Sequence, residues 1–164
     1  MSIAHAMLGE FEHESKITRR FLERVPQDKL GWKPHEKSHT AGELALHIAN
    51  VPGNVVRSAL RDESPLPDFA KMFTQPATLQ EILSSHEKSI ETVREFLPTL
   101  DDARLMTTWS GMRDGKPLIT MPRVMFLRSI MLNHWIQHRG QLGVYLRLVG
   151  AKVPASYGPS GDEG

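Results

Sequence analysis

The sequence contains no cysteine, and this absence removes several kinds of chemistry at once. A disulfide framework, a thiolate metal site and a cysteine nucleophile are all excluded, so any sulfur nucleophile would have to be a separate thiol molecule. Long apolar runs are also lacking, which excludes a membrane-spanning helix. Because residues 1–12 lack the apolar centre of a signal peptide, we expect a cytoplasmic protein.

An excess of charge of one sign is missing as well. The 20 Lys and Arg residues are balanced by 19 Asp and Glu residues, which leaves a net charge of +1 with neutral histidines. Nucleic-acid binding needs a dense cationic face, and three arginines of the last helix form at most a modest patch, better explained as a solvated face or a dimer rim: Arg128, Arg139 and Arg147. We therefore expect no nucleic-acid and no membrane partner.

The composition is that of one folded domain over residues 1–164. Hydrophobic residues make up 40% of the chain, enough for a single core, and Gly and Pro are too few for low-complexity disorder. Apolar residues recur at helical spacing in four stretches, and the fold class that this predicts is all-α, a four-helix bundle. The expected helices cover residues 3–25, 40–55, 78–97 and 122–150.

Local signals refine this arrangement. Thr40 and Glu43 have the spacing of a capping box at the start of the second helix, which Pro52 should bend. A polar link marked by prolines, residues 62–76, follows that helix. Between the third and fourth helices, Asp114-Gly115 separates two β-prone runs, and this pattern predicts a small β-hairpin insertion over residues 105–121.

Three of the eight histidines lie on apolar helix faces. His134 and His138 are four residues apart and project from the same side of the last helix. At 100° per residue, other core-type or polar residues lie within about 60° of His134: Leu127, Met131, Gln141 and Tyr145. The two imidazoles are therefore expected to point into the core. An unpaired buried ring nitrogen costs roughly 1–3 kcal/mol, and a metal ion satisfies both rings together.

His47 is the third of these histidines, on the apolar stripe of the second helix. Three neutral imidazoles can hold one divalent ion and leave a coordination position for water or substrate, as in catalytic metal sites. The alternative is that His47, His134 and His138 are core histidines with separate hydrogen-bond partners. The remaining histidines are expected at the surface (His5 and His13) or in a loop (His35 and His39), apart from His86.

Two rival metal sites do not fit the sequence. Residues 121–150 contain no Asp or Glu, which excludes a carboxylate-bridged pair of metals. Trp135 follows His134 where a zincin motif would need Glu. One metal ion in a nitrogen-rich site is the option that remains.

Further polar residues could support such a site or move a proton beside it. Glu43 lies one turn before His47, where a capping role explains it equally well, and His86 lies centrally on the apolar stripe of the third helix. His86 could be a fourth ligand, could donate a hydrogen bond to a ligand, or could be a core histidine. Gln141 and Tyr145 extend the expected polar line beyond His138 and could orient it.

Three segments resemble one known family. Residues 134–148, HWIQHRGQLGVYLRL, resemble the last-helix signature of the DinB family, the YfiT-like metal-dependent proteins. Residues 40–48, TAGELALHI, are similar to that family's helix-two motif, whose histidine is the first metal ligand, and residues 153–160 are similar to its closing segment. The resemblance implies an up-down-down-up bundle, commonly dimeric. It also implies one nickel or zinc ion per chain, held by His47, His134 and His138.

The resemblance suggests two functions. Characterised relatives include transferases and isomerases that use low-molecular-weight thiols, which implies metal-dependent thiol transfer to a small electrophile, or hydrolysis. The alternative is a stress-response homodimer that binds a metal or small ligand without turnover. A fourth protein ligand such as His86 or Glu43 would favour the static site, and an open coordination position would favour catalysis.

Overall fold

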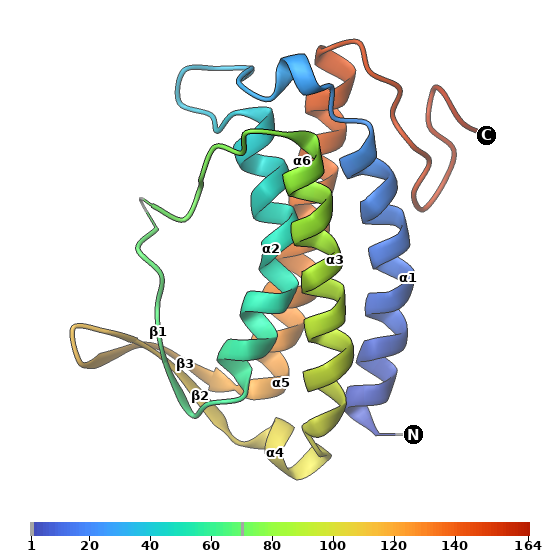
Figure 1. Ribbon diagram of the computed structural model, residues 1–164. Helices are drawn as coiled ribbons and strands as arrows, with labels where there is room; N and C mark the ends of the chain where they lie inside the picture. The colour runs from blue at the N-terminus through green and yellow to red at the C-terminus, as the bar shows by residue number, and fades with distance from the viewer. Residues whose placement is uncertain (1, 70) are drawn as a thin grey trace.

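The structure, a computed structural model, describes residues 2–69 and 71–164, and most of that chain is helical (Figure 1). The long helices are α1 (Ile3–Glu23), α2 (Ala41–Ala59), α3 (Leu79–Phe96) and α6 (Trp135–Leu148), which pack side by side around one core. Shorter helical pieces are η1 (Gln27–Lys29), η2 (Leu97–Thr99), α4 (Asp102–Met106) and α5 (Arg123–Phe126). None of the helices in these described ranges is long and apolar enough to cross a membrane.

Three of the long helices, α1, α2 and α3, begin at capping side chains. Thr40 Oγ1 accepts a hydrogen bond of 3.0 Å from the Glu43 amide, and the Glu43 carboxylate accepts one of 2.8 Å from the Thr40 amide. This confirms the predicted capping box at the start of α2. Thr78 caps α3 in the same way, since its hydroxyl accepts from the Glu81 amide at 3.1 Å.

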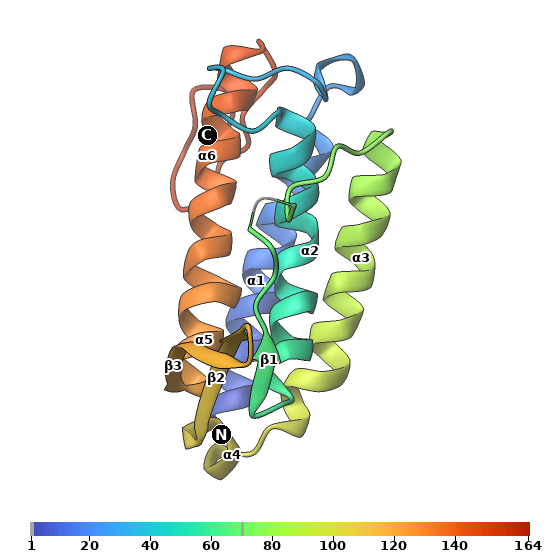
Figure 2. The ribbon, with the colours of Figure 1, turned by 90° about the vertical axis from the view of Figure 1, so that its left-hand side faces the viewer.

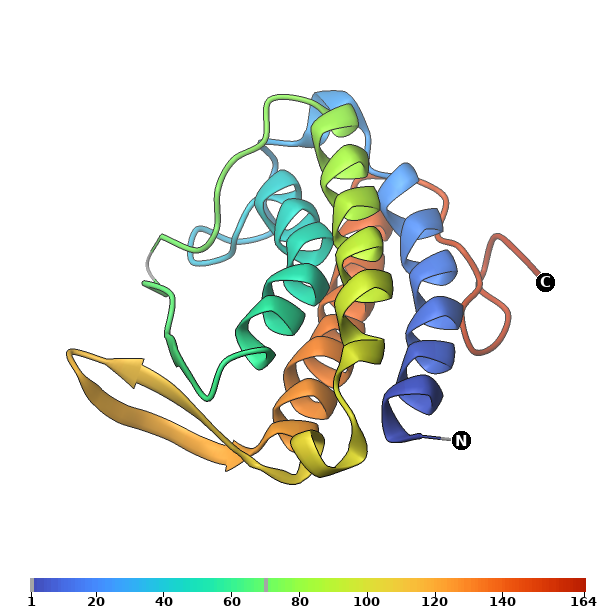
Figure 3. The ribbon, with the colours of Figure 1, turned by 60° about the horizontal axis from the view of Figure 1, so that its bottom comes forward.

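The predicted hairpin is present, and it forms part of a sheet of three strands. Strands β2 (Thr108–Arg113) and β3 (Lys116–Pro122) are antiparallel, and their turn has positive φ at Asp114 (51°) and Gly115 (73°). A third strand, β1 (Glu63–Pro65), pairs in parallel with β2, within residues 62–76 where the sequence predicts only a link. Figure 3 shows this sheet projecting from one end of the helices.

The last helix is not one continuous α-helix, contrary to the sequence prediction. Between α5 and α6 the chain forms a π-helix, η3 (Leu127–His134), which ends at one of the candidate ligands. A π-helix differs from an α-helix in its i→i+5 backbone hydrogen bonds, which the apolar pattern of residues 122–150 does not reveal when it is placed at 100° per residue. Short π-helical stretches are frequent at functional sites, and this one delivers His134 to the start of α6.

One hydrogen bond ties α2 to the last helix. Pro52 has no backbone N–H and leaves the Ile48 carbonyl without its partner inside α2. The indole Nε1 of Trp135 donates to that carbonyl at 2.9 Å, and the Trp135 side chain is fully buried. Ile48 directly follows His47 in the chain, and Trp135 directly follows His134. The bond therefore fixes how α2 faces the last helix beside both histidines.

The arginines of the last helix do not share one solvated face as expected. Arg128 and Arg147 are exposed, but Arg139 is only 2% exposed and donates to the buried Glu14 carboxylate at 2.6 Å and to the Tyr157 hydroxyl at 2.9 Å. Because α1 packs on this side of α6, Arg139 belongs to the interior. The weak cationic patch is therefore smaller than the sequence suggested.

Candidate metal centre

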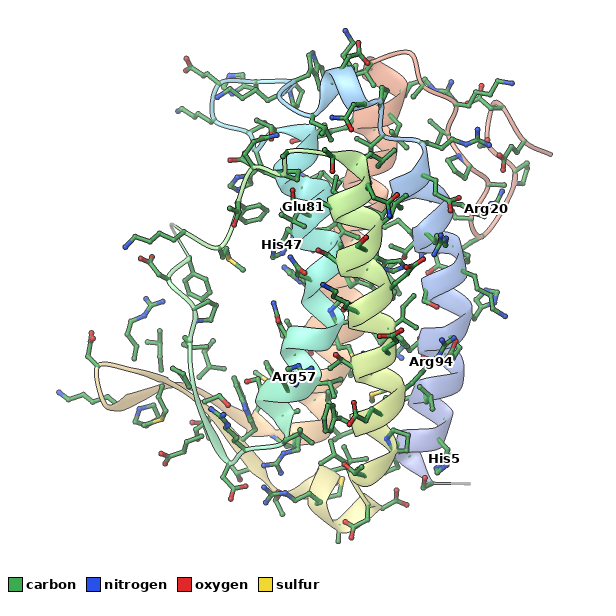
Figure 4. The ribbon with its side chains drawn as sticks, in the orientation of Figure 1. His5, Arg20, His47, Arg57, Glu81 and Arg94 are labelled. Carbon is green, nitrogen blue, oxygen red and sulfur yellow. The ribbon has the colours of Figure 1, made fainter. Side chains whose placement is uncertain are left out.

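Three histidines from two helical segments meet on one side of the bundle. His47 lies on α2, His134 ends the π-helix and His138 follows one turn later on α6. Each offers one ring nitrogen, and these nitrogens all lie within 4.8 Å of one another. Figure 4 places His47 partway along α2, on the side where the 66–78 link passes, and Figure 2 shows this link running between α2 and the last helix.

The three rings are nearly perpendicular to one another. Ring centroids are 5.4 Å apart for His47 and His134, 4.9 Å for His47 and His138, and 4.4 Å for His134 and His138. The interplanar angles are 86–88°. The rings are therefore not stacked on one another, and one nitrogen of each lies close enough to the other two for the three to share an ion.

Hydrogen bonds show which nitrogens are free. His138 Nδ1 donates to the Gln141 side-chain carbonyl at 3.0 Å, which leaves a lone pair on its Nε2, and this Nε2 lies 2.9 Å from His134 Nε2. Among the described residues, neither the buried Nε2 of His47 nor Nδ1 of His134 has a hydrogen-bond partner. An unpaired buried nitrogen is costly, so the orphaned Nε2 of His47 beside two other imidazoles fits a metal ligand.

All three rings are held in the neutral form that binds metals. Burial, with the neighbouring His138 and His134, lowers the pKa of His47 to about 3. Burial and His138 lower the pKa of His134 to about 4, against the opposing effect of the Ile130 carbonyl. Burial also lowers the pKa of His138, although its hydrogen bond to Gln141 opposes this. No proton therefore has to leave these rings near neutral pH before a metal binds.

The site is less buried than the helical periodicity of the sequence predicted. His47 is 6% exposed, but His134 and His138 are only half-buried, and Gln141 is exposed instead of lying on a buried polar line. The expected orientation toward the core thus holds fully for His47 alone. One side of the cluster consequently faces a region that small molecules can reach.

The other candidates take different positions. Gln141 contacts His138 and orients its ring. Glu43 is committed to the capping box, His86 is buried with Nε2 3.4 Å from the Ser15 carbonyl, and the Tyr145 hydroxyl donates to the His39 carbonyl at 3.3 Å. In the described residues, neither Glu43 nor His86 is part of the group of ring nitrogens that could share an ion.

Two aromatic side chains that the sequence did not single out for the site lie against it. The Phe73 ring stacks on His47, with centroids 4.4 Å apart and planes at 26°, and on His39, at 3.5 Å and 7°. His39 is the loop residue that the sequence predicts, yet it forms part of the surroundings of the cluster. Nothing in the local sequence signals this, because Phe73 reaches the site from a segment whose described residues form neither helix nor strand.

The protein is thus a helical bundle that carries a small sheet and a cluster of three histidines. The whole chain, residues 1–164, matches the model of the DinB family, and the protein belongs to that family. The resemblance inferred from residues 134–148 is thereby confirmed.

Known relatives agree with this assignment. The uncharacterised protein YrdA of Bacillus subtilis (strain 168) is 26% identical over 158 residues, which cover 95% of this chain and 89% of YrdA. A crystal structure of a DinB-like protein from Bacillus cereus ATCC 10987 is similar with a TM-score of 0.74 at 24% identity, over 95% of this chain and 98% of that one. The DinB-like protein YjoA of Bacillus subtilis gives 0.71 at 22% identity, over 93% and 97%. These two structures support the fold.

Proposed function

We propose that this protein binds one divalent metal ion per chain through His47, His134 and His138. The observation that carries the proposal is the buried Nε2 of His47, which has no hydrogen-bond partner in the described part of the chain and belongs to a group of three neighbouring imidazoles. The resemblance to the DinB family makes nickel or zinc the expected ion, because imidazole nitrogen by itself suits several divalent metals. Membership of the DinB family supports the same ligand set.

We further propose that the site is catalytic and transfers a low-molecular-weight thiol to a small electrophile, with hydrolysis as a related possibility. A divalent ion lowers the pKa of bound water toward ~7 and holds a thiol as its thiolate. The chain's three imidazoles would hold the ion, Gln141 orients His138, and the absence of cysteine avoids a competing protein thiolate. Because Glu43 and His86 are engaged elsewhere, a coordination position is left for a small molecule.

Two structural features of the family are proposals for this chain as well. The directions of the helices in Figure 1 support an up-down-down-up order, with α2 and α3 parallel and joined by a long link. Val144 and Leu148 lie one turn apart on α6, and each is 59% exposed. Such a pair of apolar residues supports a homodimer, which light scattering of the wild type and of Val144→Glu would test.

Elemental analysis of untagged protein tests the metal proposal most directly. We expect about one nickel or zinc per chain, removed by a chelator together with several degrees of thermal stability, since binding to the folded state alone stabilises it. Protein without metal that also fails to respond to added nickel or zinc would contradict the site. A screen of metal-loaded protein with thiols and electrophiles then tests catalysis, and no turnover with any pair would leave the non-catalytic binding protein as the function.

A further inference from the structure

Phe73 lies between two imidazoles as a flat ring in a slot. Its centroid is 3.5 Å from that of His39 and 4.4 Å from that of His47, with interplanar angles of 7° and 26°. Two rings stacked this closely on one face of a phenyl group would overlap each other. His39 and His47 therefore cover opposite faces of Phe73, and the distance between them admits one flat ring.

The slot opens beside the three-histidine cluster. One of its walls, His47, is a member of the cluster, and the ring centroid of a second member, His138, lies 6.4 Å from the Phe73 centroid with the two planes at 77°. A group in the slot would consequently lie against the face of one candidate ligand and next to another. This is the place where the reacting part of a substrate has to be held.

The two walls and the occupant belong to different parts of the chain. His47 is on α2, the backbone carbonyl of His39 accepts the Tyr145 hydroxyl of α6 at 3.3 Å, and the His39 Nδ1 lies 3.9 Å from the Glu43 carboxylate of α2, so both walls lie against the helices. Phe73 comes from the 66–78 link, whose described residues contain neither helix nor strand. Moving Phe73 aside would therefore leave the walls in place.

We propose that this slot binds a flat aromatic or conjugated group of a small-molecule substrate, and that Phe73 fills it in the absence of that substrate. The inference deepens the proposed function, on which it rests for the role of the neighbouring cluster. Stacking on two imidazole faces selects a planar π system, because a puckered saturated ring cannot contact both faces closely. The occupant need not carry a charge.

The test compares two ligands that differ only in the ring. Metal-free Phe73→Ala protein, as the full chain, is titrated calorimetrically with phenylacetate and with cyclohexylacetate. We expect phenylacetate to bind the variant about tenfold more tightly than cyclohexylacetate does, and about tenfold more tightly than it binds the wild type, where Phe73 competes. Using metal-free protein prevents the carboxylate from binding an ion.

Proton NMR gives a readout that a purely structural role for Phe73 would not produce. The ring current of Phe73 shifts the imidazole carbon-bound protons of His39 and His47 upfield in the wild type. This shift should disappear in Phe73→Ala and return when phenylacetate is added, but not when cyclohexylacetate is added. If Phe73→Ala does not fold, Phe73→Leu keeps an apolar side chain and removes the flat ring, and the same two readouts apply.

Phe69→Ala is the matched control. Phe69 is on the same link and is 50% exposed. The Arg113 guanidinium lies over its ring, with Cζ 4.9 Å from the ring centroid, so Phe69 packs against the hairpin and not in the slot. Its removal should change neither the affinities nor the histidine signals. His39→Ala in the Phe73→Ala background removes one wall and should weaken phenylacetate several-fold while leaving cyclohexylacetate nearly unchanged.

Equal affinity for the two ligands, or equal binding of phenylacetate by wild type and variant, would overturn the slot. Zinc titration of the same proteins separates this result from the metal proposal. Normal zinc stoichiometry without selectivity for the flat ring rejects the slot alone. Selectivity for the flat ring without zinc binding rejects the metal site and its thiol chemistry, while the slot remains.

Discussion

The indole nitrogen of Trp135 donates to the carbonyl of Ile48, the one backbone acceptor in α2 that Pro52 deprives of its helical donor. Trp135 follows His134 in the chain, and Ile48 follows His47. A single hydrogen bond of 2.9 Å thus joins the two helical segments directly beside the residues that form the cluster. Pro52 leaves the Ile48 carbonyl without a donor, and this carbonyl in turn accepts the N–H of the buried Trp135 indole.

Trp135→Phe should lower the free energy of unfolding by about 1–3 kcal/mol for the unsatisfied carbonyl, in addition to lost packing. Pro52→Ala supplies a backbone N–H that can bond Ile48 within α2. The loss from Trp135→Phe should therefore be smaller in the Pro52→Ala background, whereas the packing contribution is the same in both. Urea unfolding of the four proteins measures this coupling, and equal losses in the two backgrounds would contradict it.

His134→Ala should reduce metal binding from about one equivalent per chain to none, because three ligands from two helical segments become two. His5→Ala is the control. His5 is exposed at the start of α1, far from His47 in Figure 4, and its Nδ1 is 2.7 Å from the Ser2 hydroxyl. Metal content is measured on both proteins after gel filtration, and equal losses would mean that the cluster is not the site.

The candidate ligands could be found from sequence because they depend on local periodicity. His134 ends η3 and His138 lies one turn later on the regular helix α6, and His47 lies on the apolar stripe of a helix whose start is fixed by a capping box. Placing residues at 100° per residue predicted less well which side chains are buried, since the sequence does not say which side of α6 the rest of the bundle covers. The prediction therefore placed Gln141 inside and Arg139 outside, whereas Gln141 is exposed and Arg139 is buried.

The surroundings of the cluster depend on contacts between distant segments. Phe73 stacks on His39 and His47, and its position is decided by the path of the link between β1 and α3. The parallel pairing of β1 with β2 sets the start of this path, through partners such as Ser64 and Gly111. A strand of three residues has no period that a sequence pattern could reveal.

Metal affinity should depend little on pH down to about 5.5. Three histidines with ordinary pKa values near 6.5 would bind roughly a thousandfold more weakly at pH 5.5 than at pH 7.5, because protons compete for every ring. Here burial lowers the pKa of His47 to about 3 and that of His134 to about 4, and also lowers that of His138. We expect a loss below about tenfold for zinc titrated at the two pH values. A thousandfold loss would show that the three rings are hydrated and that their pKa values are not lowered.

His86 should make the metal-free protein sensitive to acid. Burial lowers its pKa to about 4 in the fold, so between pH 6.5 and 4 the unfolded chain binds a proton there that the folded chain does not. The free energy of unfolding therefore rises with pH across this window, and on the order of 3 kcal/mol is lost as the pH falls from 6.5 to 4. His86→Leu removes this contribution. Urea unfolding across the window should give a flatter profile for the variant, and parallel profiles would refute the assignment.

The buried pair of Arg139 and Glu14 should matter far more to stability than the exposed pair of Arg128 and Glu10. The side chains of Arg139 and Glu14 are 3% and 6% exposed, against 45% and 39% for Arg128 and Glu10. Glu14→Gln leaves a buried guanidinium without its counter-charge and should cost about 3–5 kcal/mol. Glu10→Gln should cost less than about 1 kcal/mol, since water solvates both partners.

The same pair links the fold to the C-terminal segment, which gives the comparison a second readout. Arg139 also donates to the Tyr157 hydroxyl, and its guanidinium lies 5.3 Å from the Tyr157 ring centroid. If Glu14 holds Arg139 in place, Glu14→Gln should increase hydrogen exchange in residues 153–160 as well as lowering the unfolding free energy. Glu10→Gln should change neither. Equal costs for the two substitutions would mean that solvent reaches Arg139, and the interior position assigned to it on the side of α6 away from His138 would be wrong.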